Sequence, residues 1–214
     1  MELHYYPSNA SMAPHILLEE IGQPFRLIKV DRTRDAHKTP DYLKLNPNGL
    51  IPVLVDGELV LYESAAICLH LADKYPMAEL APGLGTPERA HFYKWLIWMT
   101  NTLQATLLLY FYPERWASPD QIQGATALKA RAEAKAGSLL AHLEAELARH
   151  GGPWLLGAQY TALDAYALML CRWTRDFGCP ARSLPYLGEY LSRLLERPAV
   201  QRVFAREELL PPLV

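Results

Sequence analysis

Two short polar clusters stand where the sequence predicts a helix to begin, and both could bind or stabilise an anion. Ser8, Asn9 and Ser11 follow a predicted strand and immediately precede a predicted helix. Hydroxyl and amide donors there would add to the positive end of the helix. Glu63 and Ser64 begin another predicted helix, whose backbone N–H groups, with the Ser64 hydroxyl, could bind a carboxylate. The Glu63 carboxylate could accept from an ammonium group, although an acidic first turn that only caps the helix is the alternative.

The elements that must position these clusters form an α/β pattern in the first third of the chain. Short apolar runs predict strands, one helical pattern ends at Gly22, and Asp56-Gly57 predicts a two-residue hairpin turn. The predicted order is a strand over 3–6, a helix over 13–21, a strand over 25–30, a short helical piece over 41–45, a hairpin of 52–55 and 59–61, and a helix over 63–75. A βαβ unit followed by a hairpin predicts a mixed sheet.

The remainder of the chain has helical patterns and no strand pattern. Residues 77–86 combine Pro and Gly without helical periodicity and predict a linker between a domain of residues 1–76 and an all-helical domain of residues 87–214. The predicted helices cover 88–112, 119–150, a segment opened by Thr161, 184–196 and 198–206. Thr161 and Asp164 have the spacing of a capping box, which predicts that Asp164 serves folding and not chemistry.

Composition excludes several classes of protein. With 21 basic and 23 acidic residues, the formal net charge of -2 offers no electrostatic reason to bind nucleic acid or an anionic membrane. No apolar run approaches the roughly 20 residues of a membrane span. Cys68, Cys171 and Cys179 are too few and too scattered for a disulfide framework or a zinc site. We therefore expect a soluble protein of the reducing cytoplasm with no metal.

Four segments together resemble the cytosolic glutathione S-transferase family, and the similarity runs from Met1 to about Phe204. The segments are YPSNAS at 6–11, NPNGLIPVL at 46–54, LYESAAI at 61–67 and YTALDAY at 160–166. Each is weak alone, but their order and spacing are specific for this fold. The resemblance implies an N-terminal thioredoxin-like domain that binds glutathione as co-substrate, followed by a C-terminal helical bundle.

In the resembling family, the first of these segments activates the glutathione thiol, which reacts as a thiolate. Ser11 is the first choice for the group that stabilises the thiolate, followed by Asn9 and Ser8. A serine that only caps the helix is the alternative. Compared with bacterial beta-class members, the chain has Ala10 in place of a cysteine and Gln104 in place of a histidine. We therefore expect no mixed disulfide with glutathione in this turn, and the lack of a Cys-x-x-Cys pattern argues against thioredoxin-type redox chemistry.

The second and third segments imply contacts with the body of glutathione. Ile51-Pro52 resembles the family's cis-proline loop, which pairs with the cysteinyl part of glutathione like an added strand. The backbone of Ile51 or Val53 would form that pair here, and a trans proline that merely opens an edge strand is the alternative. Glu63 and Ser64 would bind the γ-glutamyl ammonium and carboxylate groups.

Further glutathione contacts are implied by the resemblance alone. His37 and Lys38 follow the second predicted strand, where the family often recruits a basic group for the glycine carboxylate, although both could be solvated loop charges. The family forms a two-fold homodimer through the helix predicted over 88–112. Asn101 on that helix could reach the glutathione of the neighbouring subunit, and Gln104 could contact glutathione within its own subunit.

The electrophile would bind between the two domains, in a pocket of apolar and amphipathic side chains. The candidates for this pocket are Tyr5, Gln104, Leu108, Tyr112, Trp116 and Trp173. For each aromatic residue, ordinary packing in the core is the alternative.

The predicted function is that of a glutathione S-transferase, which activates the thiol of glutathione to attack a small hydrophobic electrophile, as in detoxification. A glutathione-dependent peroxidase or disulfide reductase is an alternative, because a second glutathione can supply the other sulfur. A non-catalytic ligand carrier or scaffold is another, because Ala10 and Gln104 depart from the beta-class pattern. The sequence does not determine the electrophile.

Overall fold

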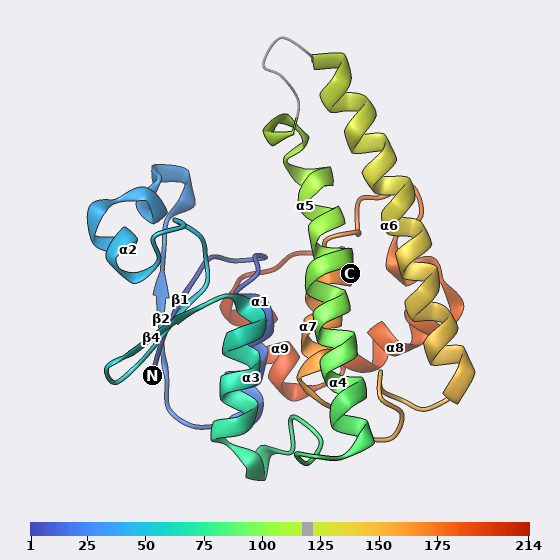
Figure 1. Ribbon diagram of the computed structural model, residues 1–214, viewed down its shortest axis with the longest axis horizontal. Helices are drawn as coiled ribbons and strands as arrows, with labels where there is room; N and C mark the ends of the chain where they lie inside the picture. The colour runs from blue at the N-terminus through green and yellow to red at the C-terminus, as the bar shows by residue number, and fades with distance from the viewer. Residues whose placement is uncertain (117–121) are drawn as a thin grey trace.

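The computed structural model of the chain describes residues 1–116 and 122–214. A sheet with its helices occupies one side of the molecule, and long helices occupy the other (Figure 1). Residues 119–121, which the sequence assigns to the start of a helix, lie outside the described residues. In the described part of the chain, no helix is long and apolar enough to cross a membrane.

Four short strands form one mixed sheet in the order β2-β1-β3-β4. They are β1 (Glu2–Tyr5), β2 (Arg26–Lys29), β3 (Val53–Asp56) and β4 (Leu59–Tyr62). Strand β1 runs parallel to β2, with Leu3 opposite Leu27, and antiparallel to β3, with Leu3 opposite Leu54. The predicted βαβ unit and the mixed sheet are therefore confirmed.

Three helices cover the two faces of this sheet: α1 (Met12–Ile21), α2 (Pro40–Leu45) and α3 (Ser64–Lys74). Helices α1 and α3 pack against each other and against the C-terminal helices, so their side of the sheet belongs to the main core. Helix α1 ends at Gly22, whose φ of 71° supplies the left-handed C-cap that the sequence predicts. On the other side, α2 covers a smaller cluster of Val30, Tyr42, Ile51 and Val53.

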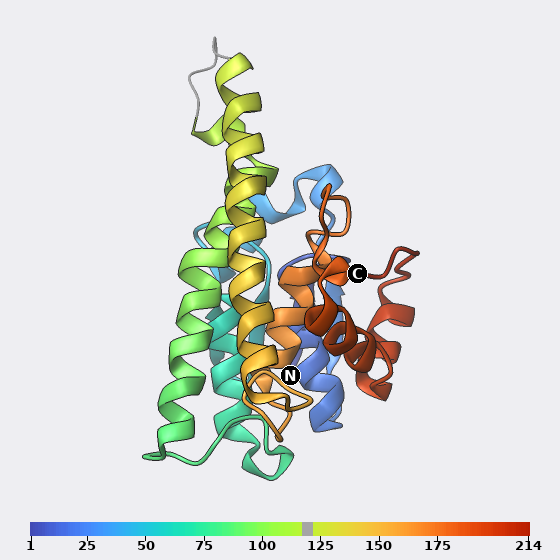
Figure 2. The same ribbon diagram turned by 90° about the vertical axis from the view of Figure 1, so that its right-hand side faces the viewer.

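In the described residues of the C-terminal half, the regular elements are helices, as predicted. Its helices are α4 (Pro87–Trp98), α5 (Ala105–Phe111), α6 (Ile122–His150), α7 (Ala162–Arg172), α8 (Pro185–Leu195) and α9 (Pro198–Arg206). Helix α6 lies alongside the rod of α4 and α5 (Figure 2). Every residue of α7 is buried, so this helix forms the centre of the molecule.

The capping box at the start of α7 is confirmed. The Thr161 hydroxyl accepts from the Leu163 N–H, and the Asp164 carboxylate accepts from the Thr161 N–H at 2.7 Å. The same carboxylate accepts from the Leu155 N–H at 2.9 Å and from the Tyr190 hydroxyl at 2.8 Å. Burial raises the pKa of Asp164 in spite of these hydrogen bonds. The Asp164 carboxylate therefore joins the start of α7 to Leu155 and to Tyr190 of α8 inside the core.

One local prediction was wrong. Asp56 still pairs with Leu59, so the hairpin turn consists of Gly57 and Glu58 and not of Asp56-Gly57. Gly57 has a φ of 63°, which suits glycine at the first turn position.

The helix predicted over 88–112 contains a π-helical segment, Met99–Gln104, between α4 and α5. Such segments widen one turn of a helix and are frequent at functional sites.

Candidate functional site

A cavity of about 640 Å³ lies between the α/β half and the helical half. This volume suits a small organic ligand, for which pockets of roughly 300–1,000 Å³ are usual. We call the part formed by the α/β half the sheet-side wall; its main residues are Ser8, Asn9, Ala10, Arg32, His37, Lys38, Ile51, Pro52, Glu63 and Ser64. We call the part formed by the helical half the helix-side wall; its residues are Gln104, Leu108, Phe111, Tyr112, Arg115, Trp173 and Arg175.

The turn between β1 and α1 presents two polar side chains to the cavity. Ser8 has a φ of 58°, in the left-handed region, and its N–H donates to the Glu207 carboxylate at 2.8 Å. Asn9 Oδ1 accepts from the Ala10 N–H at 2.5 Å. Because the amide oxygen is used in this way, the Asn9 NH₂ group remains as a donor for a ligand. Ser8 and Asn9 can thus supply a hydroxyl and an amide donor at one point of the wall.

Ser11, the first choice for stabilising a thiolate, does not line the cavity. Its side chain is fully buried, and its hydroxyl donates to the Tyr6 carbonyl at 3.1 Å while accepting from the Tyr6 N–H at 3.3 Å. The hydroxyl makes no capping bond to α1 either. Its place in the structure indicates that Ser11 closes the turn, whereas Ser8 and Asn9 line the cavity.

The start of α3 faces the cavity with two unusual features. Glu63 has a φ of 70°, a conformation that non-glycine residues rarely adopt and that concentrates at functional sites. The Ser64 hydroxyl donates to the Ala10 carbonyl at 2.9 Å, which ties the α3 start to the β1–α1 turn. Because that hydroxyl proton is used, the backbone N–H groups of the first turn of α3 remain the donors for a carboxylate.

The loop before β3 forms the next part of the sheet-side wall. The Ile51–Pro52 bond is cis, as the sequence predicts, and both residues line the cavity. The Tyr42 hydroxyl and the Asn46 side-chain amide each donate to the Leu50 carbonyl at 2.8 Å, which holds the loop from behind. Val53 is fully buried within β3 and does not reach the cavity. Of the two backbone partners that the sequence leaves open, Ile51 is the one at the wall.

The predicted basic residues lie at the edge of the sheet-side wall, beside an arginine that the sequence analysis did not select. Lys38 pairs with Asp35 at 2.9 Å, and both side chains are largely exposed. Burial lowers the pKa of His37, and the positive charges of Arg32 and Lys38 lower it further. Arg32 Nη2 donates to the Tyr112 hydroxyl at 3.0 Å and so joins the two walls.

On the helix-side wall, Gln104 has a defined orientation. Its Oε1 accepts from the Tyr166 hydroxyl at 2.5 Å, and burial raises the pKa of Tyr166, so the phenol remains a donor. The Gln104 NH₂ group is then free to donate toward the cavity. Gln104 is the last residue of the π-helical segment.

The other helix-side predictions divide into two groups. Leu108, Tyr112 and Trp173 line the cavity, whereas Tyr5, Asn101 and Trp116 do not. Tyr5 is only 9% exposed and packs beside His15, and Trp116 is 72% exposed. Asn101 is exposed on the π-helical segment.

Three residues of the helix-side wall, Phe111, Arg115 and Arg175, were missed by sequence reasoning. Phe111 follows Gln104 and Leu108 at helical spacing, and this spacing could have revealed it. Arg115 and Arg175 follow the ends of two helices, and nothing in their local sequence distinguishes them from surface charges.

Comparisons with known proteins agree with this architecture. Residues 7–74 match the family model of the glutathione S-transferase N-terminal domain. The chain is 31% identical over 209 residues to glutathione S-transferase GST-4.5 of Xanthomonas campestris pv. campestris, with 98% of this chain and 100% of that protein covered. It is 30% identical over 217 residues to the disulfide-bond oxidoreductase YfcG of Escherichia coli (strain K12), with 98% and 96% covered.

Among solved structures, a sphingomonad glutathione S-transferase complexed with glutathione matches with a TM-score of 0.83 at 30% identity. The match covers 98% of this chain and 100% of that one. A thioredoxin-like domain, a helical half and a cavity between them are the features of one class of glutathione-binding proteins. The chain belongs to the glutathione S-transferase family.

Proposed function

We propose that the chain is a glutathione transferase that forms the glutathione thiolate at Ser8 and Asn9 and directs it at an electrophile on the helix-side wall. The observation that carries this proposal is the division of one cavity into two chemically different walls. The sheet-side wall has groups for each polar end of glutathione. The helix-side wall combines Leu108, Phe111 and Trp173, as an apolar co-substrate requires.

Glutathione would lie along the sheet-side wall. The first-turn N–H groups of α3 would bind the γ-glutamyl carboxylate, and Glu63 would accept from the ammonium group. The cysteinyl backbone would pair with that of Ile51 at the edge of the sheet. His37 and Lys38 would attract the glycine carboxylate. This placement leaves the sulfur beside Ser8 and Asn9.

The chemistry follows from the donors around the sulfur. A free thiol has a pKa of about 8.5 and reacts as the thiolate. The Ser8 hydroxyl, the Asn9 amide and the nearby start of α1 would stabilise the negative charge and lower that pKa. The proton leaves to solvent, the sulfur forms a bond with the electrophilic carbon, and the leaving group departs with its electron pair.

Disulfide reduction with glutathione is the second candidate, because the similar YfcG protein is named a disulfide-bond oxidoreductase. The turn has Ala10 where a cysteine would be needed to form a disulfide with glutathione. Cys68 and Cys171 are buried, burial raises the pKa of both thiols, and the exposed Cys179 does not line the cavity. The thiolate of a bound glutathione would therefore have to act with a second glutathione.

We also propose a cytoplasmic homodimer with a role in detoxification. Tyr93 and Ile97 on α4 are large apolar side chains that are 38% and 58% exposed, and a partner subunit would cover them. Asn101 is exposed farther along the same rod and would face that partner.

The near-ultraviolet absorbance of bound glutathione thiolate, titrated with pH, tests the proposed function. We expect thiolate to form well below pH 8.5, and each of Ser8→Ala and Asn9→Ala to raise the thiol pKa by about one unit. Ser11→Ala is the comparison variant, because its hydroxyl is used within the turn, and it should leave the pKa within a few tenths of a unit. Glutathione that binds with an unshifted thiol would instead support a non-catalytic carrier.

A further inference from the structure

The cavity has more positive charge than the proposed glutathione contacts use. Of the described residues that line it, Glu63 alone is acidic, and glutathione's own ammonium group would take that carboxylate. His37 and Lys38 of the sheet-side wall would bind the glycine carboxylate. Arg115 and Arg175 on the helix-side wall are then left without a role, as is Arg32, which donates to Tyr112 of that wall.

Arg32 and Arg115 hold Tyr112 between them. Arg32 donates to the Tyr112 hydroxyl at 3.0 Å, and the Arg115 guanidinium lies 4.1 Å from the centre of the Tyr112 ring. Within residues 1–116 and 122–214, neither arginine forms an ion pair with a carboxylate. Contact with an aromatic ring orients a guanidinium without neutralising it. Both positive charges therefore stay available to a ligand.

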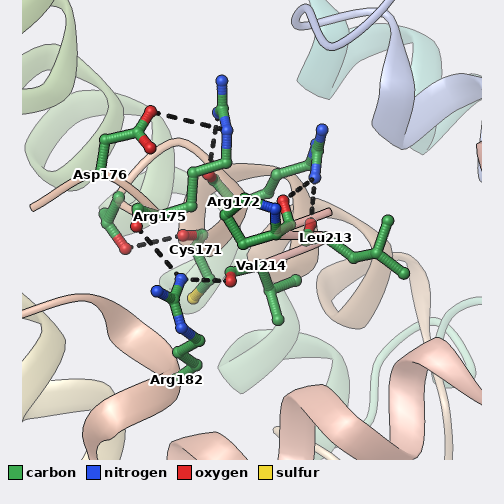
Figure 3. A network of polar contacts seen from close by, with 9 residues as sticks. Cys171, Arg172, Arg175, Asp176, Arg182, Leu213 and Val214 are labelled. Carbon is green, nitrogen blue, oxygen red and sulfur yellow. Dashed lines mark hydrogen bonds and ion pairs between the residues drawn. The ribbon is translucent and has the colours of Figure 1, made fainter. Parts of the chain in front are cut away.

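Arg175 is held in place on the segment after α7 (Figure 3). Its Nη1 donates to the Arg172 carbonyl at 3.2 Å, and its own carbonyl accepts from Arg182 at 3.1 Å. Its Nε lies 3.7 Å from a carboxylate oxygen of Asp176, whose side chain is 73% exposed. Water screens so exposed a pair, so Asp176 offsets little of the charge. Burial lowers the pKa of Arg172 to about 10, and the charge of Arg175 contributes.

We propose that the helix-side wall selects an electrophile with a flat aromatic body and a carboxylate group. This inference rests on the proposed function and names its substrate class. The rings of Phe111 and Trp173 pack edge to face, with their centroids 6.2 Å apart, and provide the apolar surface. Arginine binds carboxylates through paired hydrogen bonds and is more weakly hydrated than lysine, so it suits a partly buried anion site. The surplus positive charge also attracts anions into the cavity.

A matched pair of electrophiles isolates the charge. A chlorodinitrobenzoate and the corresponding neutral chlorodinitrobenzamide share the reacting carbon, the nitro groups and the ring. In both, the glutathione sulfur bonds to the ring carbon, the carbon–chlorine bond breaks, and chloride leaves with the electron pair. The thiol proton goes to solvent, and the carboxylate or amide does not react.

The experiment compares kcat/KM for the two electrophiles in the wild type, in Arg115→Gln, in Arg175→Gln and in the double variant. We expect the wild type to prefer the benzoate by about tenfold relative to the uncatalysed rates, and the double variant to lose most of that preference. Added salt should weaken the preference in the wild type, because exposed charges are screened. Arg131→Gln is the control, since Arg131 is exposed on α6 away from the cavity, and it should keep the preference.

Several outcomes would overturn the proposal. A wild type without preference for the benzoate would do so, as would variants in which both electrophiles slow equally while the KM for glutathione rises. The second result would assign the arginines to glutathione itself. If neither electrophile reacts, the proposed function fails separately. Calorimetry with the two S-aryl glutathione conjugates then tests the anion site, and equal affinities for the carboxylate and amide conjugates would refute it.

Discussion

The two walls of the cavity are built in different ways. The sheet-side wall depends on backbone conformation: the left-handed Ser8 and Glu63, the cis Ile51–Pro52 bond and the start of α3. The helix-side wall depends on side chains from the end of the π-helical segment, from α5, and from the segments that follow α5 and α7. A wall built on backbone conformation suits a ligand of constant structure, whereas a wall built on side chains can change its specificity by substitution.

The largest effect is expected for a substitution that disrupts the core on which both walls depend. In Asp164→Ala, four donors lose their buried acceptor: the N–H groups of Leu155 and Thr161 and the hydroxyls of Thr161 and Tyr190. We expect the free energy of unfolding to fall by about 3–5 kcal/mol, because each unsatisfied buried donor costs about 1–3 kcal/mol. Urea denaturation measures the loss, with the exposed Asp176→Ala as control. Equal urea midpoints for Asp164→Ala and the wild type would contradict the assigned role.

The next largest effect is expected where a residue of the C-terminal half contacts the sheet-side wall. Glu207 is buried and accepts from the Ser8 N–H and from His15 Nδ1, each at 2.8 Å. Glu207→Gln removes one acceptor, so we expect about 2 kcal/mol less stability. Without this acceptor for its N–H, Ser8 should shift and its hydroxyl should stabilise the thiolate less. We expect this to raise the pKa of the bound glutathione thiol by more than the lost negative charge lowers it. Denaturation and thiolate absorbance measure the two effects.

Glu208→Gln is the matched control for this variant, because Glu208 is the exposed neighbour. A Glu207→Gln protein that lost stability but kept the low thiol pKa would show that the contacts of Glu207 with Ser8 and His15 serve folding only. The sheet-side wall would then be independent of the C-terminal half.

A third variant tests whether the two walls bind their substrates independently. Phe111 is 42% exposed and lies on the helix-side wall, so Phe111→Ala should spare the fold. We expect the KM for an aromatic electrophile to rise about fivefold, which is the loss of about 1 kcal/mol of aromatic contact. The KM for glutathione should not change. Steady-state kinetics in both substrates measures this, and a parallel rise in the two KM values would mean that the walls are coupled.

The smallest effect concerns an ion pair outside the cavity. Asp56 accepts from Lys74 and from His70, and these hydrogen bonds, that of Lys74 above all, lower the pKa of Asp56. A lowered pKa means that the stabilisation exists above the ordinary value of about 3.9 and disappears as the pH falls through the lower folded value. Asp56→Asn should therefore cost less than about 1 kcal/mol at neutral pH.

Urea midpoints for Asp56→Asn and the wild type should converge as the pH falls below the ordinary value. A difference that persists in acid would show that packing, and not charge, links the hairpin to α3. Neither KM should change at neutral pH, because Asp56 lies outside both walls.

Most of the fold and much of the sheet-side wall could be predicted from the sequence. The Gly22 cap, the Thr161-Asp164 box and the Ile51-Pro52 loop each depend on residues close together in the chain. Their residue types restrict the backbone locally, whatever packs around them. The hairpin turn was one residue off, because Asp-Gly favours a turn but cross-strand pairing sets the register.

The helix-side wall could be predicted only in part. Tyr5 and Trp116 have the right residue type for a pocket, yet one is buried in the core and the other is exposed away from it. Arg115 and Arg175 look like ordinary surface charges until the ends of α5 and α7 come together in the helix-side wall.

The sequence by itself determined which backbone turns exist and therefore the wall suited to glutathione, since short-range sterics and hydrogen bonding act within a few residues. Only the tertiary structure decided that Ser11 turns inward to Tyr6 while Ser8 and Asn9 face the cavity. It also decided which arginines of the described residues form no ion pair with a carboxylate, because charge compensation depends on groups that lie far apart in the chain and come together only on folding.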